Sequence, residues 1–237
     1  MNKTLKRIIW GIVILVGILI LLAGSFFLKF YMETRHMTPA ETQRINDTVF
    51  CVKDRFVNTF IFKGKEHYLM VDAGFTAEGV KAELDKLGIP ADGITTLLLT
   101  HTDGDHIGAV GLFKDPKIYM HKDEEQMING TNGKFFMHPK WKFGPYILLN
   151  SNDTLTIDGL KIKIIHTPGH TPGSCCYMIG KDYLLTGDNL AYKNGEFGHF
   201  NNFFNMDTKE QEASIKTLPD LKSIPFILTA HYGIIRN

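Results

Sequence analysis

Four potential metal ligands fall within six residues, directly after an apolar segment. Residues 94–100 are rich in β-branched side chains, which predicts a buried strand, and His101-Thr102-Asp103-Gly104-Asp105-His106 follows at once. Imidazole and carboxylate groups are ligands for zinc, iron and manganese. A solvated polar loop is the alternative interpretation, but four such side chains after a buried strand need partners. The segment therefore predicts a metal site at the end of a strand.

The same arrangement recurs along the chain. Asp72, Asp188 and His231 each come at or just after the end of a short apolar segment that reads as a strand. His170 lies between two Pro-Gly pairs, 168–169 and 172–173, which fix the conformation of its loop. Each of these signals is weak alone. Together, in this order, they predict that distant parts of the chain converge on one metal site.

The remaining pattern predicts strands with interspersed helices. Strands are expected at 48–52, 57–62, 68–72, 154–157, 161–166, 183–186 and 226–229, and helices at 78–87 and 214–221. Strict alternation of strand and helix is missing, which favours layered mixed sheets over a doubly wound fold.

The order of these motifs resembles the metallo-β-lactamase-fold hydrolases over residues 48–237. The resemblance implies the α/β (α+β) class and a four-layer αββα sandwich. It implies two neighbouring metals, with Asp72 supporting the ligands from behind. The implied ligands are His101, Asp103 and His170 in site one, Asp105, His106 and His231 in site two, and Asp188 as a bridge between both.

One position departs from the usual His-x-His-x-Asp-His pattern of that family, because Asp103 stands where a histidine is expected. A carboxylate adds a negative charge beside the metal, which weakens its Lewis acidity and favours harder ions. The expected cofactors are two divalent ions, with zinc favoured and iron or manganese as alternatives.

The expected function is hydrolysis by a metal-bridging hydroxide, with Asp105 or Asp188 accepting the proton. An ester, thioester, lactone or phosphodiester of a small-molecule substrate fits this chemistry. Glutathione thioesters are disfavoured, because relatives that act on them have a helical C-terminal extension and this chain ends six residues after His231. Antibiotic hydrolysis is also disfavoured, since a bridging Asp is typical of other members. One alternative is a di-iron redox protein, because the carboxylate of Asp103 resembles the one that di-iron flavoproteins carry at this position of the motif. The other is a non-catalytic, metal-stabilised surface binding module.

The N-terminal part predicts a membrane anchor. Residues 8–28 are 21 consecutive uncharged residues, enough for a helix of roughly 30 Å, the thickness of the hydrocarbon core. Lys3, Lys6 and Arg7 precede them and predict a cytoplasmic N-terminus, a single-pass topology and an extracytoplasmic catalytic domain. A cleaved signal peptide, with small residues at 23–25, is the alternative. The expected parts are an anchor (1–30), a linker (31–44) and a catalytic domain (45–237).

Charge, cysteines and the other side chains complete the expectations. The net charge is +1, and the three basic residues before the apolar run leave about −2 for the rest, so no nucleic-acid partner is expected. Cys51, Cys175 and Cys176 are expected as buried apolar residues. His36, His67 and His121 are expected on the surface, and His166 in a supporting or structural role. Two aromatic loops are expected either to cover the substrate or to pack on the sheets, namely Phe135, Phe136, Met137, Trp141, Phe143 and Tyr146 in one and Phe197, Phe200, Phe203 and Phe204 in the other.

Overall fold

The computed structural model describes residues 2–134 and 137–237. The chain divides into two compact units, one ending at Met37 and the other comprising Thr38–Asn237. The first is the helix α1 (Lys3–Thr34), whose N-cap Asn2 side chain accepts a hydrogen bond from the Thr4 backbone. The helix is long and apolar enough to cross a membrane, and none of its residues is buried in protein.

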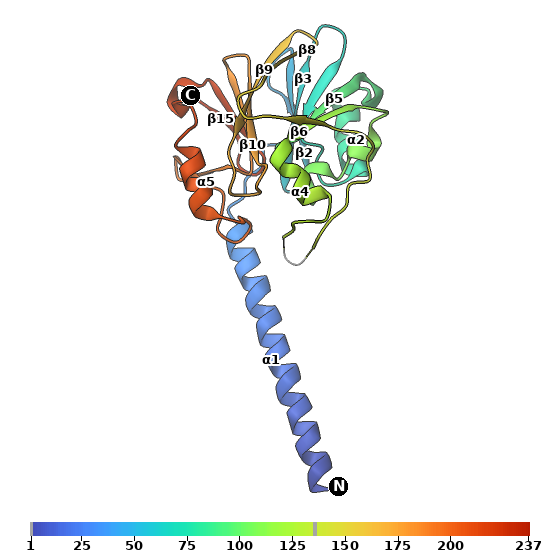
Figure 1. Ribbon diagram of the computed structural model, residues 1–237, viewed down its shortest axis with the longest axis vertical. Coiled ribbons are helices and arrows are strands. Elements are labelled where there is room, and N and C mark those ends of the chain that lie inside the picture. The colour runs from blue at the N-terminus through green and yellow to red at the C-terminus, as the bar shows by residue number, and fades with distance from the viewer. Residues whose placement is uncertain (1, 135–136) are drawn as a thin grey trace. The chain divides into compact units, whose positions relative to one another are not determined.

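The second unit contains two principal sheets and short helices (Figure 1). The strands are β1 (Gln43–Arg44), β2 (Val49–Asp54), β3 (Val57–Lys63), β4 (Tyr68–Val71), β5 (Ile94–Leu98), β6 (Lys117–His121), β7 (Ile147–Leu149), β8 (Thr154–Ile157), β9 (Leu160–His166), β10 (Cys175–Ile179), β11 (Tyr183–Gly187), β12 (Leu190–Lys193), β13 (Glu196–His199), β14 (Phe226–Thr229) and β15 (Gly233–Arg236). The helices are α2 (Ala77–Leu87), α3 (Gly104–Ile107), α4 (Glu125–Ile128) and α5 (Thr208–Ile215).

The first sheet has the order β1-β2-β3-β4-β5-β6-β7 and the second the order β15-β14-β11-β10-β9-β8, while β12 and β13 form a separate hairpin. Neighbours pair antiparallel at both outer ends of the second sheet and from β1 to β4 in the first. The parallel pairs are β4 with β5, β5 with β6, β6 with β7, and β11 with β14.

Side-chain alternation along the strands creates the layers. On β3, Phe60 and Phe62 point into the core between the two sheets, while Ile61 points to the other face and packs with Val80 and Leu84 of α2. On the second sheet the outer face packs against the chain around α5. Figure 1 shows α2 and α5 on opposite sides of the strands. The predicted four-layer αββα sandwich is therefore confirmed.

The adjacent cysteines follow the same alternation. Cys175 faces the core between the sheets and Cys176 the outer core, and both thiols, like that of Cys51, are free and buried. Burial raises the pKa of the Cys51 and Cys176 thiols to about 12. The prediction that these residues serve as small apolar core residues is confirmed.

The prediction of a helix over 214–221 is wrong, because the helix is α5 (Thr208–Ile215). Asp207 starts it six residues earlier, since its carboxylate accepts a hydrogen bond from the Glu210 backbone N–H at 2.9 Å. Pro219 disfavours helical geometry at the residue before it, so the helix ends upstream. Apolar spacing alone did not reveal this cap.

Candidate metal centre

The structure brings all seven predicted ligands together. The carboxyl ends of the parallel strands β4 and β5 deliver Asp72 and His101, and those of β11 and β14 deliver Asp188 and His231 to the same edge. The four histidines are at most 2% exposed, and Asp188 is 4% exposed. The ligand atoms gather in three overlapping groups, which are His101, Asp103 and His170; His101, His106 and Asp188; and Asp105, His106 and His231.

The two oxygens of Asp188 face two different histidine groups. Its Oδ2 lies 3.4 Å from Nε2 of His170 and 3.9 Å from Nε2 of His101. Its Oδ1 lies 3.1 Å from Nε2 of His231 and 3.4 Å from Nε2 of His106. One carboxylate therefore stands between the two predicted halves of the site, as a bridging ligand requires.

Each histidine turns Nε2 into the site because Nδ1 has a partner outside it. Nδ1 of His231 donates to the Phe56 carbonyl at 2.8 Å, and Nδ1 of His106 donates to Asp72 at 2.9 Å. Nδ1 of His101 lies 3.0 Å from the Thr100 hydroxyl, which itself donates to Asp72 and so accepts from the ring. Outer partners of this kind fix the ring orientation in metal sites. Asp72 therefore supports the site from behind.

The partner of His170 belongs to a short relay. The Phe200 backbone N–H donates to Oε1 of Gln211, which makes that oxygen an acceptor for the Asn205 amide at 2.7 Å. The Asn205 Oδ1 then accepts from Nδ1 of His170 at 3.1 Å. A backbone N–H can only donate a hydrogen bond. The donor and acceptor roles of Gln211, Asn205 and His170 in the relay therefore follow from it. Sequence reasoning missed Asn205 and Gln211, since isolated amides in a loop and a helix carry no recognisable spacing.

Three buried atoms in the site lack a hydrogen-bond partner within the described part of the chain, namely Nε2 of His101, Nε2 of His106 and Oδ1 of Asp188. Leaving a buried polar atom without a partner costs about 1–3 kcal/mol. A cation between these atoms would satisfy all of them. The donor set of imidazole and carboxylate therefore fits divalent metal ions.

The electrostatics of the metal-free site are strongly coupled. Burial lowers the pKa of the His101 imidazole to about 4, and the nearby His106 adds to this effect. Burial opposes the charged form of His231, but the Asp188 carboxylate raises the pKa of His231 to about 10. Burial likewise opposes ionisation of Asp188, yet His231 and His106 hold its pKa well below the usual range. Metal binding would therefore displace protons from the site.

Two glycines allow the backbone to approach closely enough. Gly187 has φ +50°, and a Cβ there would lie 2.3 Å from the Thr100 hydroxyl oxygen, so Asp188 reaches the end of β5 only because Gly187 lacks a side chain. Gly169 has φ +131°, and a Cβ there would lie 2.3 Å from the backbone nitrogen of Gln211. The absence of a side chain at Gly187 and Gly169 therefore allows the two ligand loops to pack closely against the rest of the site.

Glu124 joins two of the ligand loops. It is fully buried, and its carboxylate accepts four hydrogen bonds. Oε1 accepts from the backbone and hydroxyl of Thr102, and Oε2 from the Thr171 hydroxyl and the Gly173 backbone. In the sequence it lies among charged residues and gives no sign of this role.

Aromatic residues from the two loops contact different parts of the molecule. Phe200 is 2% exposed and stacks on His231 with ring centroids 5.2 Å apart, so it forms a wall of the metal centre. Trp141, Phe143 and Tyr146 are partly buried against the core beside α2, as packing residues. Phe135 and Phe136, named in the same loop, lie outside the described residues.

Of the three histidines expected on the surface, two are exposed and one is buried. His36 and His67 are exposed, as expected. His121 was expected on the surface and is 1% exposed, so this prediction is wrong. It is the last residue of β6 and stacks on His166 with ring centroids 3.8 Å apart, whereas the charged Lys122 and Asp123 that follow it lie beyond the strand.

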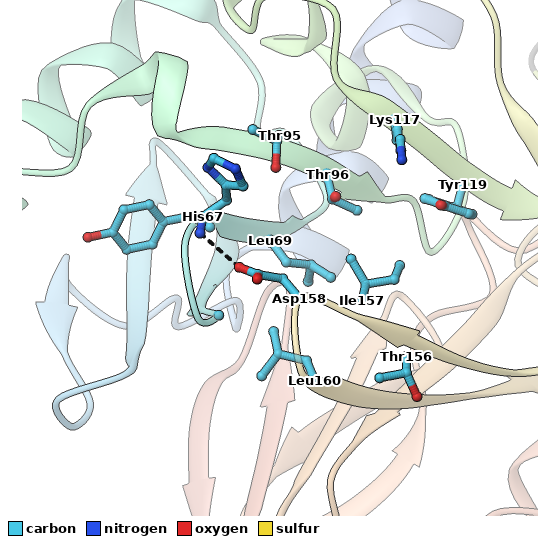
Figure 2. Close-up of a pocket in the computed structure, with 12 residues that line it drawn as sticks. His67, Leu69, Thr95, Thr96, Lys117, Tyr119, Thr156, Ile157, Asp158 and Leu160 are labelled. Carbon is cyan, nitrogen blue, oxygen red and sulfur yellow. Dashed lines mark hydrogen bonds between the residues drawn. The ribbon is translucent and has the colours of Figure 1, made fainter.

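A cavity of about 460 Å³ lies at the opposite edge of the sandwich, at the amino ends of β5 and β6 (Figure 2). Its carboxylate, Asp158, already accepts hydrogen bonds from the backbone N–H groups of Glu66 and His67, the second at 2.8 Å. The cavity thus has no part in the centre at the carboxyl end of β5.

Comparison with known proteins agrees with this geometry. A family model described as the metallo-beta-lactamase superfamily matches residues 52–226. An uncharacterized protein of Aquifex aeolicus is 26% identical, over 69% of this chain and 78% of its own length. A hydroxyacylglutathione hydrolase of Aeromonas hydrophila is 29% identical, over 80% of this chain and 66% of its own length. The solved structure of a metallo-beta-lactamase family protein from Thermus thermophilus superposes with a TM-score of 0.63 at 20% identity, covering 81% of this chain and 76% of that one.

Proposed function

Because this chain belongs to the metallo-beta-lactamase superfamily of metal-dependent hydrolases, we propose that it works with two divalent cations held side by side. The observation that carries this proposal is the position of Asp188, whose two oxygens face two separate pairs of histidine Nε2 atoms. The proposed ligands are His101, Asp103 and His170 in site one, and Asp105, His106 and His231 in site two. Zinc is the proposed metal, with iron and manganese as the alternatives to be tested beside it.

A pair of bound cations would lower the pKa of a water molecule and polarise the bond to be cleaved. The residues of the chain would hold the cations, orient the substrate and accept protons. Asp105 is 20% exposed in its side chain and lies 3.4 Å from Nε2 of His231, so it is accessible to solvent and is the proposed proton acceptor. Asp188 is the proposed second acceptor, because it lies between the two groups. Phe200 covers the histidines from one side and keeps bulk water from them.

The proposed substrates are small molecules with an ester, thioester, lactone or phosphodiester bond. A hydrolytic reaction is supported by the similarity to the hydroxyacylglutathione hydrolase. The chain covers 66% of that relative's length, so the glutathione part of its substrate is not carried over to this protein.

A substrate screen tests this function. The protein, loaded in parallel with zinc, manganese or iron, should hydrolyse at least one of a set of aryl esters, thioesters, lactones and bis-aryl phosphates. Asp188→Asn should lower that rate by at least about a hundredfold, since even residues that only support metal ligands cost 10–100-fold when changed. Asp92→Asn, in the turn before β5, is the matched control and should keep full activity. Full activity in Asp188→Asn would rule out the two-metal assignment.

The proposed location is a single-pass membrane anchor with the catalytic domain, residues 45–237, outside the cytoplasm and residues 31–44 as the linker. It is supported by the apolar helix α1 and by the three basic residues at its N-terminal end. In right-side-out membrane vesicles, added protease should digest the catalytic domain. Protection of that domain until detergent is added would contradict the proposed orientation.

A further inference from the structure

A lysine side chain occupies one half of the metal centre. Nζ of Lys134, from the loop between α4 and β7, lies 2.6 Å from Oδ2 of Asp103 and 3.0 Å from Nε2 of His170. The lysine side chain is only 9% exposed. Its ammonium group thus contacts two of the three residues proposed as ligands of site one.

The ammonium and a metal ion need the same electron pair of His170. The Asn205 relay uses the Nδ1–H of this ring, so in the neutral imidazole the lone pair lies on Nε2. An ammonium group can only donate, so Nε2 is the acceptor in its contact with Lys134. A metal ligated by Nε2 requires that same lone pair. The two cations therefore exclude each other at His170.

The ammonium also takes the electrostatic place of a cation. Oδ2 of Asp103 and Nε2 of His170 are 3.0 Å apart, and two acceptors at that distance repel unless a positive group lies between them. Lys134 supplies that group, because its Nζ lies within hydrogen-bonding distance of both atoms. Within the described chain, no lysine or arginine makes an ion pair with Asp105 of site two.

We propose that Lys134 is a built-in competitor for the metal of site one, so that the two sites fill in order, site two first. This inference rests on the proposed two-metal centre. Loading of the second metal requires Lys134 to leave Asp103 and His170, which makes the fully loaded state dependent on the free metal concentration. The apparent affinity of site one is reduced because part of the protein is held in the lysine-occupied form.

A zinc titration tests the inference. The full-length protein in detergent is equilibrated with buffers of graded free zinc, and bound zinc per chain is measured by mass spectrometry of the element. Wild-type protein should fill in two steps. Lys134→Met should shift the second step to lower free zinc by about tenfold or more and leave the first step in place. Lys134→Gln, which keeps a polar side chain, should shift it in the same direction.

Lys140→Met is the matched control, because this exposed lysine of the same loop does not contact the ligands. It should leave both steps unchanged. An equal shift in Lys140→Met, or no shift in both Lys134 variants, would overturn the competition. Two zinc ions bound with equal affinity by wild-type protein would also overturn it and leave the proposed function standing. Binding of no zinc by any variant would instead remove the two-metal centre and the inference with it.

Discussion

At the residue scale, the metal centre is organised by what lies behind each ligand. In each of the four histidines, Nδ1 forms a hydrogen bond with a carbonyl, a carboxylate, a hydroxyl or an amide oxygen. This bond directs Nε2 into the centre. Asp72 and Gln211 are not among the proposed ligands. Through their hydrogen bonds they nevertheless determine which ring nitrogen of a histidine points into the centre. Removal of such a supporting residue typically lowers metal affinity by about 10–100-fold.

Glu124 gives a pH prediction that belongs to one residue. Burial raises the pKa of this carboxyl to about 7, although hydrogen bonds from Thr171 and Thr102 act in the opposite direction. An unfolded chain releases the proton near pH 4.5, whereas the folded protein holds it until about pH 7. Between these values the unfolded state binds fewer protons, so this group makes stability fall as the pH rises.

Glu124→Gln removes that titration. We expect the difference in free energy of unfolding, wild type minus variant, to fall by up to roughly 3 kcal/mol from about pH 4.5 to pH 7 and to stay flat above about pH 8. Urea unfolding of both metal-free proteins at several pH values measures it. A difference that stays constant or increases over this window would mean that the four hydrogen bonds keep Glu124 ionised at lower pH.

At the scale of elements, the strands that carry ligands were predictable from sequence. The apolar segments before His101, Asp188 and His231 became β5, β11 and β14, because short runs of buried, β-branched residues have few other solutions in a soluble fold. The helix α2 ends at Leu87, the residue at which the predicted helix also ends, and Gly88 caps it with φ +68°.

Elements set by local side-chain caps or by long-range contacts were not predictable. The start of α5 depends on one hydrogen bond to Asp207, which the apolar pattern does not reveal. The burial of His121 depends on its stacking against His166, 45 positions away in sequence. Lys134 and Glu124 likewise gain their roles only from chain segments that fold beside them.

At the scale of the whole molecule, the sandwich brings together residues that span 130 positions of the sequence, from His101 to His231. Both sheets supply ligands from the carboxyl ends of their parallel strands, so the metal ions would link the two sheets at one edge. The helix α1 is a separate compact unit, and its exposed apolar surface is suited to a membrane.

The most direct test of the central claim is anomalous X-ray scattering from crystals of the metal-loaded protein. We predict two peaks roughly 3.5–4 Å apart, the separation typical of two-metal hydrolases. One should lie against Asp103 and His170, the other against Asp105 and His231, with Asp188 contacting both. One peak at saturating metal, or two peaks that Asp188 does not join, would contradict it.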